Sequence, residues 1–170
     1  MLVLGLVVAA FAGAARAEEK RASPHDRASA TVGGTKVTIE YGRPYKKGRA
    51  IFGGLVPYGQ IWRTGADEAT TLTTDGDLTI GALRVPKGTY ALFTLPNKNE
   101  WTLVVNKTAK EWGAFSYNAK DDLGRVPMKV GAAAPPVEQF TIEVKPAGDR
   151  KATLKLSWDT LVASVPLASP

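Results

Sequence analysis

The sequence predicts an all-β protein: a single antiparallel β-sandwich, or a partly open barrel, with at most short helical turns. Two observations predict this fold. Apolar and polar residues alternate along several short segments, and turn residues recur between those segments at intervals of roughly ten residues. No window of about a dozen residues keeps a helical period. We therefore restrict helix to a short turn around residues 107–112.

The strand predictions differ in the faces they bury. Three segments alternate strictly, as strands with one solvated face do: residues 37–41, 140–144 and 154–158. Residues 89–95 and 101–105 are apolar on both faces, which indicates strands covered on both sides. Gly81-Ala82 predicts a type II′ hairpin, because glycine comes first in a two-residue loop. Residues 132–136, rich in alanine and proline, are expected to be a stiff connector.

The predicted organisation is a signal peptide (1–17), an N-terminal arm (18–27), one β-sandwich domain (28–165) and a frayed tail (166–170). The apolar run near the start is shorter than the roughly 20 residues that span a bilayer. Ala15-Arg16-Ala17 follows it with the small-x-small form that signal peptidase needs. We expect an exported protein, periplasmic or extracellular, without a transmembrane anchor.

Composition limits the chemistry. The chain has no cysteine, which excludes disulfides, thiol nucleophiles and a lipidated cysteine, and it has one histidine. That residue, His25, lies beside Asp26 in the predicted arm; an exposed terminal position explains it, although a metal or a partner could also use it. We predict no catalytic residue, no metal and no cofactor. The net charge of +6 suits anionic surfaces but is modest for nucleic acid, which we do not expect as a partner.

A glycine-rich segment, residues 41–70, concentrates the remaining chemistry. A long ordered connection inside a compact domain is often functional, and no phosphate-binding loop pattern occurs in this one. Its basic and aromatic side chains favour an anionic glycan, an envelope polymer or a protein partner. The candidate ligand-binding residues are Arg43, Arg49, Tyr58, Trp62, Arg63, Asp67 and Glu68.

Two other interpretations of this segment stay open. In a structural one, Trp62 fills the edge of the core, and Arg63 forms a buried ion pair with Asp67 or Glu68. In an enzymatic one, Asp67 or Glu68 and Arg63 form the centre of a carboxylate-dependent hydrolase or lyase acting on an extracellular or envelope polymer. Adjacent residues on a strand face opposite ways, so the two carboxylates could act together only from a loop.

Several motifs of the chain occur in the same order as in a known family. They include Tyr-Gly-Arg-Pro (41–44), Ile-Phe-Gly-Gly-Leu-Val-Pro-Tyr-Gly (51–59), Ile-Trp-Arg-Thr-Gly-Ala-Asp-Glu-Ala-Thr (61–70) and Trp-Gly-Ala-Phe (112–115). With these motifs the chain resembles the bacterial "domain of unknown function 2911" family over about residues 28–165. The resemblance implies export and a single domain, and it adds no mechanism. Relatives often carry Asn at the position of Asp67, which weighs against catalysis by that carboxylate.

The boundary after Ala17 generates a direct prediction. N-terminal sequencing of the exported protein should begin at Glu18, because signal peptidase cleaves after the second small residue of its motif. An uncleaved chain recovered from the cytoplasm would contradict the predicted localisation.

Overall fold

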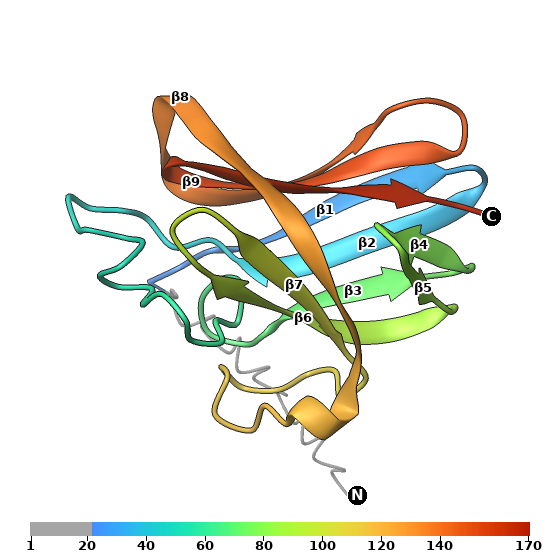
Figure 1. The fold of residues 1–170 in the computed structure, drawn as a ribbon, viewed down its shortest axis with the longest axis horizontal. Helices are drawn as coiled ribbons and strands as arrows, with labels where there is room; N and C mark the ends of the chain where they lie inside the picture. Colours follow the sequence, from blue (N-terminus) through green and yellow to red (C-terminus); the bar gives the residue numbers. More distant parts are fainter. Residues whose placement is uncertain (1–21) are drawn as a thin grey trace, which may run out of the picture.

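The computed structural model describes residues 22–170 (Figure 1). The predicted signal peptide, residues 1–17, and the first part of the predicted arm lie outside this range. The described chain forms one antiparallel sheet of nine strands with a single 3₁₀ turn, Ala119–Asp121. The strands are β1 (His25–Val32), β2 (Thr35–Gly42), β3 (Thr70–Thr74), β4 (Leu78–Ile80), β5 (Leu83–Val85), β6 (Gly88–Pro96), β7 (Trp101–Asn106), β8 (Asp122–Pro146) and β9 (Lys151–Ala168).

The strand order is β1-β2-β3-β6-β7-β8-β9-β4-β5, and the sheet does not close into a barrel. The prediction of an all-β antiparallel fold is confirmed. The helical turn lies at Ala119–Asp121 rather than at 107–112, because the Asn118 side chain caps that segment by accepting a hydrogen bond from Lys120 N.

The long strand β8 makes the sheet two-layered. Its first residues pair with β7, and the rest pairs with β9. Figure 1 shows β8 and β9 lying over β1 and β2, and β1 packs against β8. Residues 132–136, predicted as a connector, lie inside β8, where the register with β9 shifts. Pro135 and Pro136 cannot donate to a ladder, so they interrupt the pairing without ending the strand.

The five segments with strand patterns fall within β2, β6, β7, β8 and β9. In β2, Val37 and Ile39 are fully buried while Glu40 is exposed, as the alternation predicts. The predicted hairpin is formed by β4 and β5, and Gly81 has a φ of 56° as the first turn residue. A type II′ turn needs this left-handed conformation at that position, so glycine is favoured there.

Both predicted ends of the domain need correction. The predicted arm, 18–27, contains the start of β1, where His25 pairs with Gly42 of β2. The predicted frayed tail, 166–170, is the end of β9, and Leu167 pairs with Ile80 of β4 and is 1% exposed. Pairing with β4, far away in the sequence, orders the tail and buries its apolar residues.

Leu167→Ala tests this correction. Truncating a fully buried leucine should lower the free energy of unfolding by about 2–5 kcal/mol, measured by urea titration. The control is Leu55→Ala, because Leu55 is 48% exposed and should cost about 0.5 kcal/mol or less. Equal midpoints for the two variants would mean that the tail is frayed after all.

Candidate functional site

The long connection between β2 and β3 is fixed to the core by Trp62. Trp62 forms an isolated antiparallel β-bridge with Thr94 of β6. Trp62 N donates to Thr94 O at 2.8 Å, and Thr94 N donates to Trp62 O at 2.9 Å. Its indole Nε1 donates to Gly65 O at 3.2 Å, which closes a short turn after the ring. The ring is 8% exposed. The interpretation that Trp62 fills the edge of the core is therefore confirmed.

Trp62 joins an aromatic cluster that links the connection to the other strands. Its ring stacks on Trp158 of β9 at 6.0 Å between centroids, and it meets Phe140 of β8 at 5.1 Å. Trp101 of β7 and Phe52 of the connection lie edge-on to it at 6.2 Å each. Aromatic pairs in such edge-on and stacked arrangements stabilise beyond their buried area, by about 0.5–1.5 kcal/mol each.

A tight turn after Trp62 sets the direction of Asp67 and Glu68. Thr64 and Asp67 have left-handed φ angles of 57° and 62°, which are costly for residues with side chains. Buried hydroxyl groups support the turn: Thr70 Oγ1 donates to Thr64 O at 2.7 Å. Gly42 permits the close approach, because a Cβ there would lie 2.2 Å from Ala66 O. The turn is thus over-determined by packing and hydrogen bonds.

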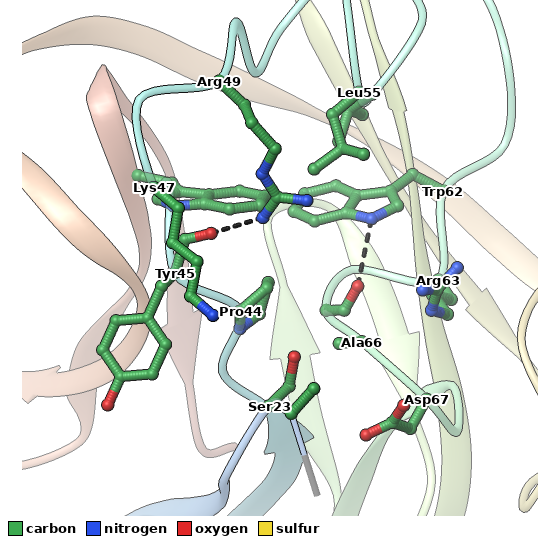
Figure 2. Close-up of a pocket in the computed structure, with 14 residues that line it drawn as sticks. Ser23, Pro44, Tyr45, Lys47, Arg49, Leu55, Trp62, Arg63, Ala66 and Asp67 are labelled. Atoms are coloured by element: carbon green, nitrogen blue, oxygen red, sulfur yellow. Dashed lines mark hydrogen bonds between the residues drawn. The ribbon is translucent and has the colours of Figure 1, made fainter.

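A cavity of about 450 Å³ opens beside this turn. Trp62 and Trp158 line it together with Leu55. Figure 2 shows Arg49 and Arg63 near the Trp62 ring and Lys47 farther from it, beside Tyr45. The charged lining residues are Lys47, Arg49, Arg63 and Asp67. Three cations and one carboxylate give this cavity an excess of positive charge.

The two arginines of this cavity differ in their partners. Arg49 is exposed, and its Nε donates to Lys46 O at 3.0 Å, while Nη2 donates to Tyr45 O. The Arg63 guanidinium makes no hydrogen bond or ion pair within residues 22–170, and its Nε is buried. The predicted ion pair of Arg63 with Asp67 or Glu68 is therefore wrong.

Asp67 and Glu68 instead lie beside His25, at the start of β1. His25 Nε2 lies 3.2 Å from Glu68 Oε2 and 3.5 Å from Asp67 Oδ2. Asp67 has a left-handed φ of 62°, and its carboxylate lies beside His25 of β1 and makes no ion pair with Arg63 within residues 22–170. Main-chain bonds hold the pair from the other side: Gly113 N donates to Asp67 O at 3.1 Å.

The two carboxylates open onto different cavities. Asp67 lines the cationic cavity, whereas Glu68 and His25 line a second one of about 520 Å³ with Tyr41 and Lys110. Burial raises the pKa of Tyr41, whose hydroxyl donates to Ile142 O at 3.3 Å and accepts from Ile142 N. A pair of acids flanking one scissile bond must face the same cavity, so this arrangement gives no support to a carboxylate dyad.

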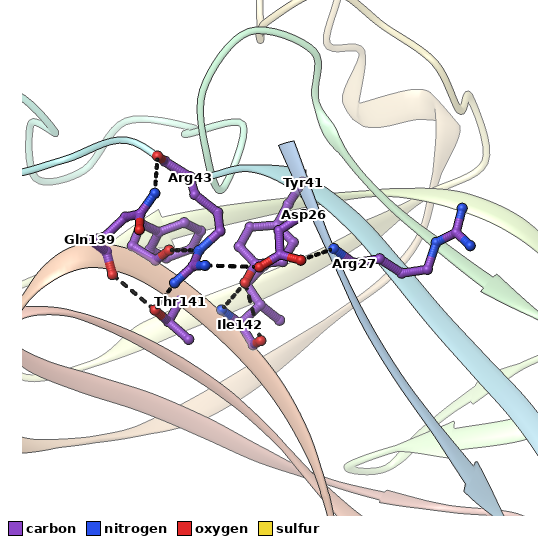
Figure 3. Close-up of polar contacts among 8 residues, drawn as sticks. Asp26, Arg27, Tyr41, Arg43, Gln139, Thr141 and Ile142 are labelled. Atoms are coloured by element: carbon purple, nitrogen blue, oxygen red, sulfur yellow. Dashed lines mark hydrogen bonds and ion pairs between the residues drawn. The ribbon is translucent and has the colours of Figure 1, made fainter. Parts of the chain in front are cut away.

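Two of the seven predicted residues lie outside both cavities. Arg43 lies in a structural network (Figure 3). Its guanidinium contacts Asp26 at 2.9 Å, Phe140 O at 3.0 Å and Thr141 Oγ1 at 2.9 Å. Tyr58 covers Gly53, whose Cβ would lie 2.8 Å from the ring. Arg49, Trp62, Arg63 and Asp67 line the cationic cavity, and Glu68 lines the second.

Several residues that line the two cavities were not predicted as site residues, among them His25, Lys47, Leu55, Lys110 and Trp158. The sequence placed His25 in the predicted arm and Trp158 in a predicted strand. His25 carried one usable signal, because it is the single imidazole of the chain. The pairing of β1 with β2, which brings His25 to the turn, could not be predicted from this single imidazole.

The fold and the cavity define a class: an all-β domain with a cation-lined cavity beside an aromatic cluster. The chain belongs to the family described as "Protein of unknown function (DUF2911)", whose model matches residues 23–167, and the resemblance seen in the sequence is confirmed. No curated protein and no solved structure matches the chain. In residues 22–170, no helix has the length and apolar character needed to cross a membrane.

Comparing the stabilities of Arg43→Met and Arg63→Met tests whether Arg43 stabilises the fold and Arg63 does not. Arg43→Met removes three contacts and should cost about 1–3 kcal/mol of unfolding free energy, since Asp26 is partly solvated. Arg63→Met should leave the urea midpoint unchanged or raise it, because it removes a partly buried cation without a partner. A larger loss for Arg63→Met than for Arg43→Met would restore the structural ion pair.

Proposed function

We propose that this protein is an exported, non-enzymatic binding module of the cell envelope or extracellular space, and that the cationic cavity holds an acidic sugar unit of a glycan. The observation that carries the proposal is the Arg63 guanidinium, which lines the cavity and has no partner within residues 22–170. A partly buried cation without an anion costs free energy, and a carboxylate ligand would offset that cost. Arginine also matches carboxylate geometry with two parallel hydrogen bonds.

The other lining residues support an acidic sugar over a free anion. Leu55 is 48% exposed and, with the indole edge of Trp62, offers apolar surface beside the cations. Binding sites for organic ligands combine such surface with a few placed polar groups. Lys47 and Arg49 are exposed at the same cavity and add positive charge that attracts an anionic ligand.

Export and charge favour a polymer of the envelope or the medium as the source of that unit. The signal-peptide pattern agrees with export, and the net charge of +6, which becomes +5 when Arg16 leaves with residues 1–17, agrees with a basic protein that meets anionic surfaces outside the cytoplasm. The hydrolase or lyase alternative lacks a comparable observation, because Asp67 and Glu68 line separate cavities.

Isothermal titration with a short oligogalacturonate tests the proposal, and the same oligomer as its methyl ester is the uncharged control. The protein should bind the acid and not the ester. Arg63→Met should weaken binding by about 10–100-fold, as expected for losing a hydrogen bond to a charged group. Arg84→Met is the matched control, because Arg84 is 78% exposed, pairs with Asp77 and lines neither cavity.

Three results would contradict the proposal. The first is binding of acid and ester with equal affinity, and the second is binding of the acid that Arg63→Met leaves unchanged. The third is release of reducing ends or unsaturated ends from the oligomer, which would indicate the enzymatic alternative.

A further inference from the structure

We propose that His25, Asp67 and Glu68 form a binding site for a divalent transition-metal ion, with Zn²⁺ as the best match. One imidazole nitrogen and two carboxylate oxygens from these residues all lie within 4.8 Å of one another. This set combines the nitrogen and oxygen ligands that Zn²⁺ takes in proteins. The site is separate from the Arg63 guanidinium that carries the proposed function.

Two of the three ligand separations match a tetrahedral ion. Zn²⁺ holds histidine nitrogen and carboxylate oxygen at about 2.0–2.2 Å, so two tetrahedral ligand atoms lie about 3.4 Å apart. The observed separations from His25 Nε2 are 3.2 Å to Glu68 Oε2 and 3.5 Å to Asp67 Oδ2. The third separation, between the two carboxylates, is at most 4.8 Å, and side-chain rotation would have to close it to about 3.4 Å for all three atoms to bind one ion.

The main chain already brings the ligands together. His25 is fixed by its antiparallel pairing with Gly42 on β2. Asp67 and Glu68 are fixed by the turn after Trp62 and by an isolated bridge between Glu68 and Trp112. Because both segments are ordered by pairing, binding an ion requires little reorganisation of the backbone.

One acceptor in the cluster lacks a hydrogen-bond donor. Asp67 Oδ2 is shielded from solvent and accepts no hydrogen bond within residues 22–170, although His25 Nε2 lies 3.5 Å away. A carboxylate oxygen buried in this way is costly, and a bound cation would compensate it. The three side chains are each about one-third exposed, at 38%, 32% and 37%, which leaves room for water as a further ligand.

The donor set favours Zn²⁺ over the abundant alkaline-earth ions. Ca²⁺ needs six to eight oxygen ligands, and Mg²⁺ demands octahedral oxygen coordination and seldom uses imidazole. An imidazole with two carboxylates suits zinc-like ions, and Mn²⁺ should bind more weakly by the general order of affinities.

Isothermal titration of ZnCl₂ into the untagged, EDTA-treated chain tests the site. We expect one ion per chain, and a higher melting temperature with Zn²⁺ but not with Mg²⁺ or Ca²⁺. His25→Gln should weaken Zn²⁺ binding by at least about 100-fold. Losing a residue that only hydrogen-bonds to a metal ligand already costs about 10–100-fold in affinity, and losing the ligand itself should cost more. The chain has no cysteine and no other histidine, so no second site of these ligands can replace it.

Asp67→Asn and Glu68→Gln should each weaken binding as well, whereas Glu40→Gln should not. Glu40 is the matched control, because it lines the same second cavity as His25 and Glu68 but pairs with Arg27. Far-UV circular dichroism of each variant without metal confirms that it is folded. Arg63→Met should keep full Zn²⁺ affinity, so a failed glycan titration leaves this test intact.

Absence of Zn²⁺ binding by the folded wild-type chain would overturn the proposal. So would binding that folded His25→Gln retains, because the ion would then sit on surface carboxylates. A fall in affinity for Glu40→Gln equal to that for Glu68→Gln would likewise show general attraction by negative charge instead of a defined site.

Discussion

Insertion of the Trp62 ring between the layers is the interaction on which the candidate site depends. Residues 43–69 contain no strand of the main sheet, so regular pairing does not hold them. The ring stacks on Trp158, and its main chain bridges Thr94, which fixes the connection at one point in the middle of its length. A buried tryptophan removes about 150–250 Å² from water, which can order a segment that lacks its own ladder. Arg63, Gly65 and Asp67 follow directly, so the position of the ring sets theirs.

The turn after Trp62 contains unfavourable backbone conformations, and it holds the Asp67 side chain in a defined orientation. Two residues with side chains, Thr64 and Asp67, adopt left-handed φ angles, and each costs on the order of 1–3 kcal/mol. The cost is offset by buried hydrogen bonds of Thr64 and by the close crossing at Gly42. The result is that Asp67 faces His25 while Arg63 remains without a partner in the described chain.

Features that depend on residues close together in the sequence could be predicted, and features that depend on pairing between distant segments could not. Side-chain alternation is local, so β2 and residues 140–144 of β8 could be predicted from single segments, and Gly81 predicts the hairpin of β4 and β5. The end of β9 could not be predicted in this way, because it is ordered by pairing with β4, which is distant in the sequence. The site shows the same division. Composition identifies residues 41–70, but the partner of Asp67 depends on one φ angle and on the register of β1 with β2. A slip of one residue would turn the His25 side chain to the other face of the sheet.

Asp67 connects the two proposed sites. It lines the cationic cavity, where its negative charge opposes an acidic ligand, and it also belongs to the cluster with His25 and Glu68. A divalent ion on that cluster would neutralise this charge and add positive potential at the cavity wall, where low dielectric strengthens the effect. The ion should therefore raise the affinity for the acidic sugar. By thermodynamic reciprocity the sugar must raise the affinity for the ion by the same factor. His25 belongs to the ion cluster and Arg63 only to the cationic cavity. His25→Gln should therefore abolish the effect of Zn²⁺ on sugar affinity while sugar binding itself remains, and it serves as the control for that coupling.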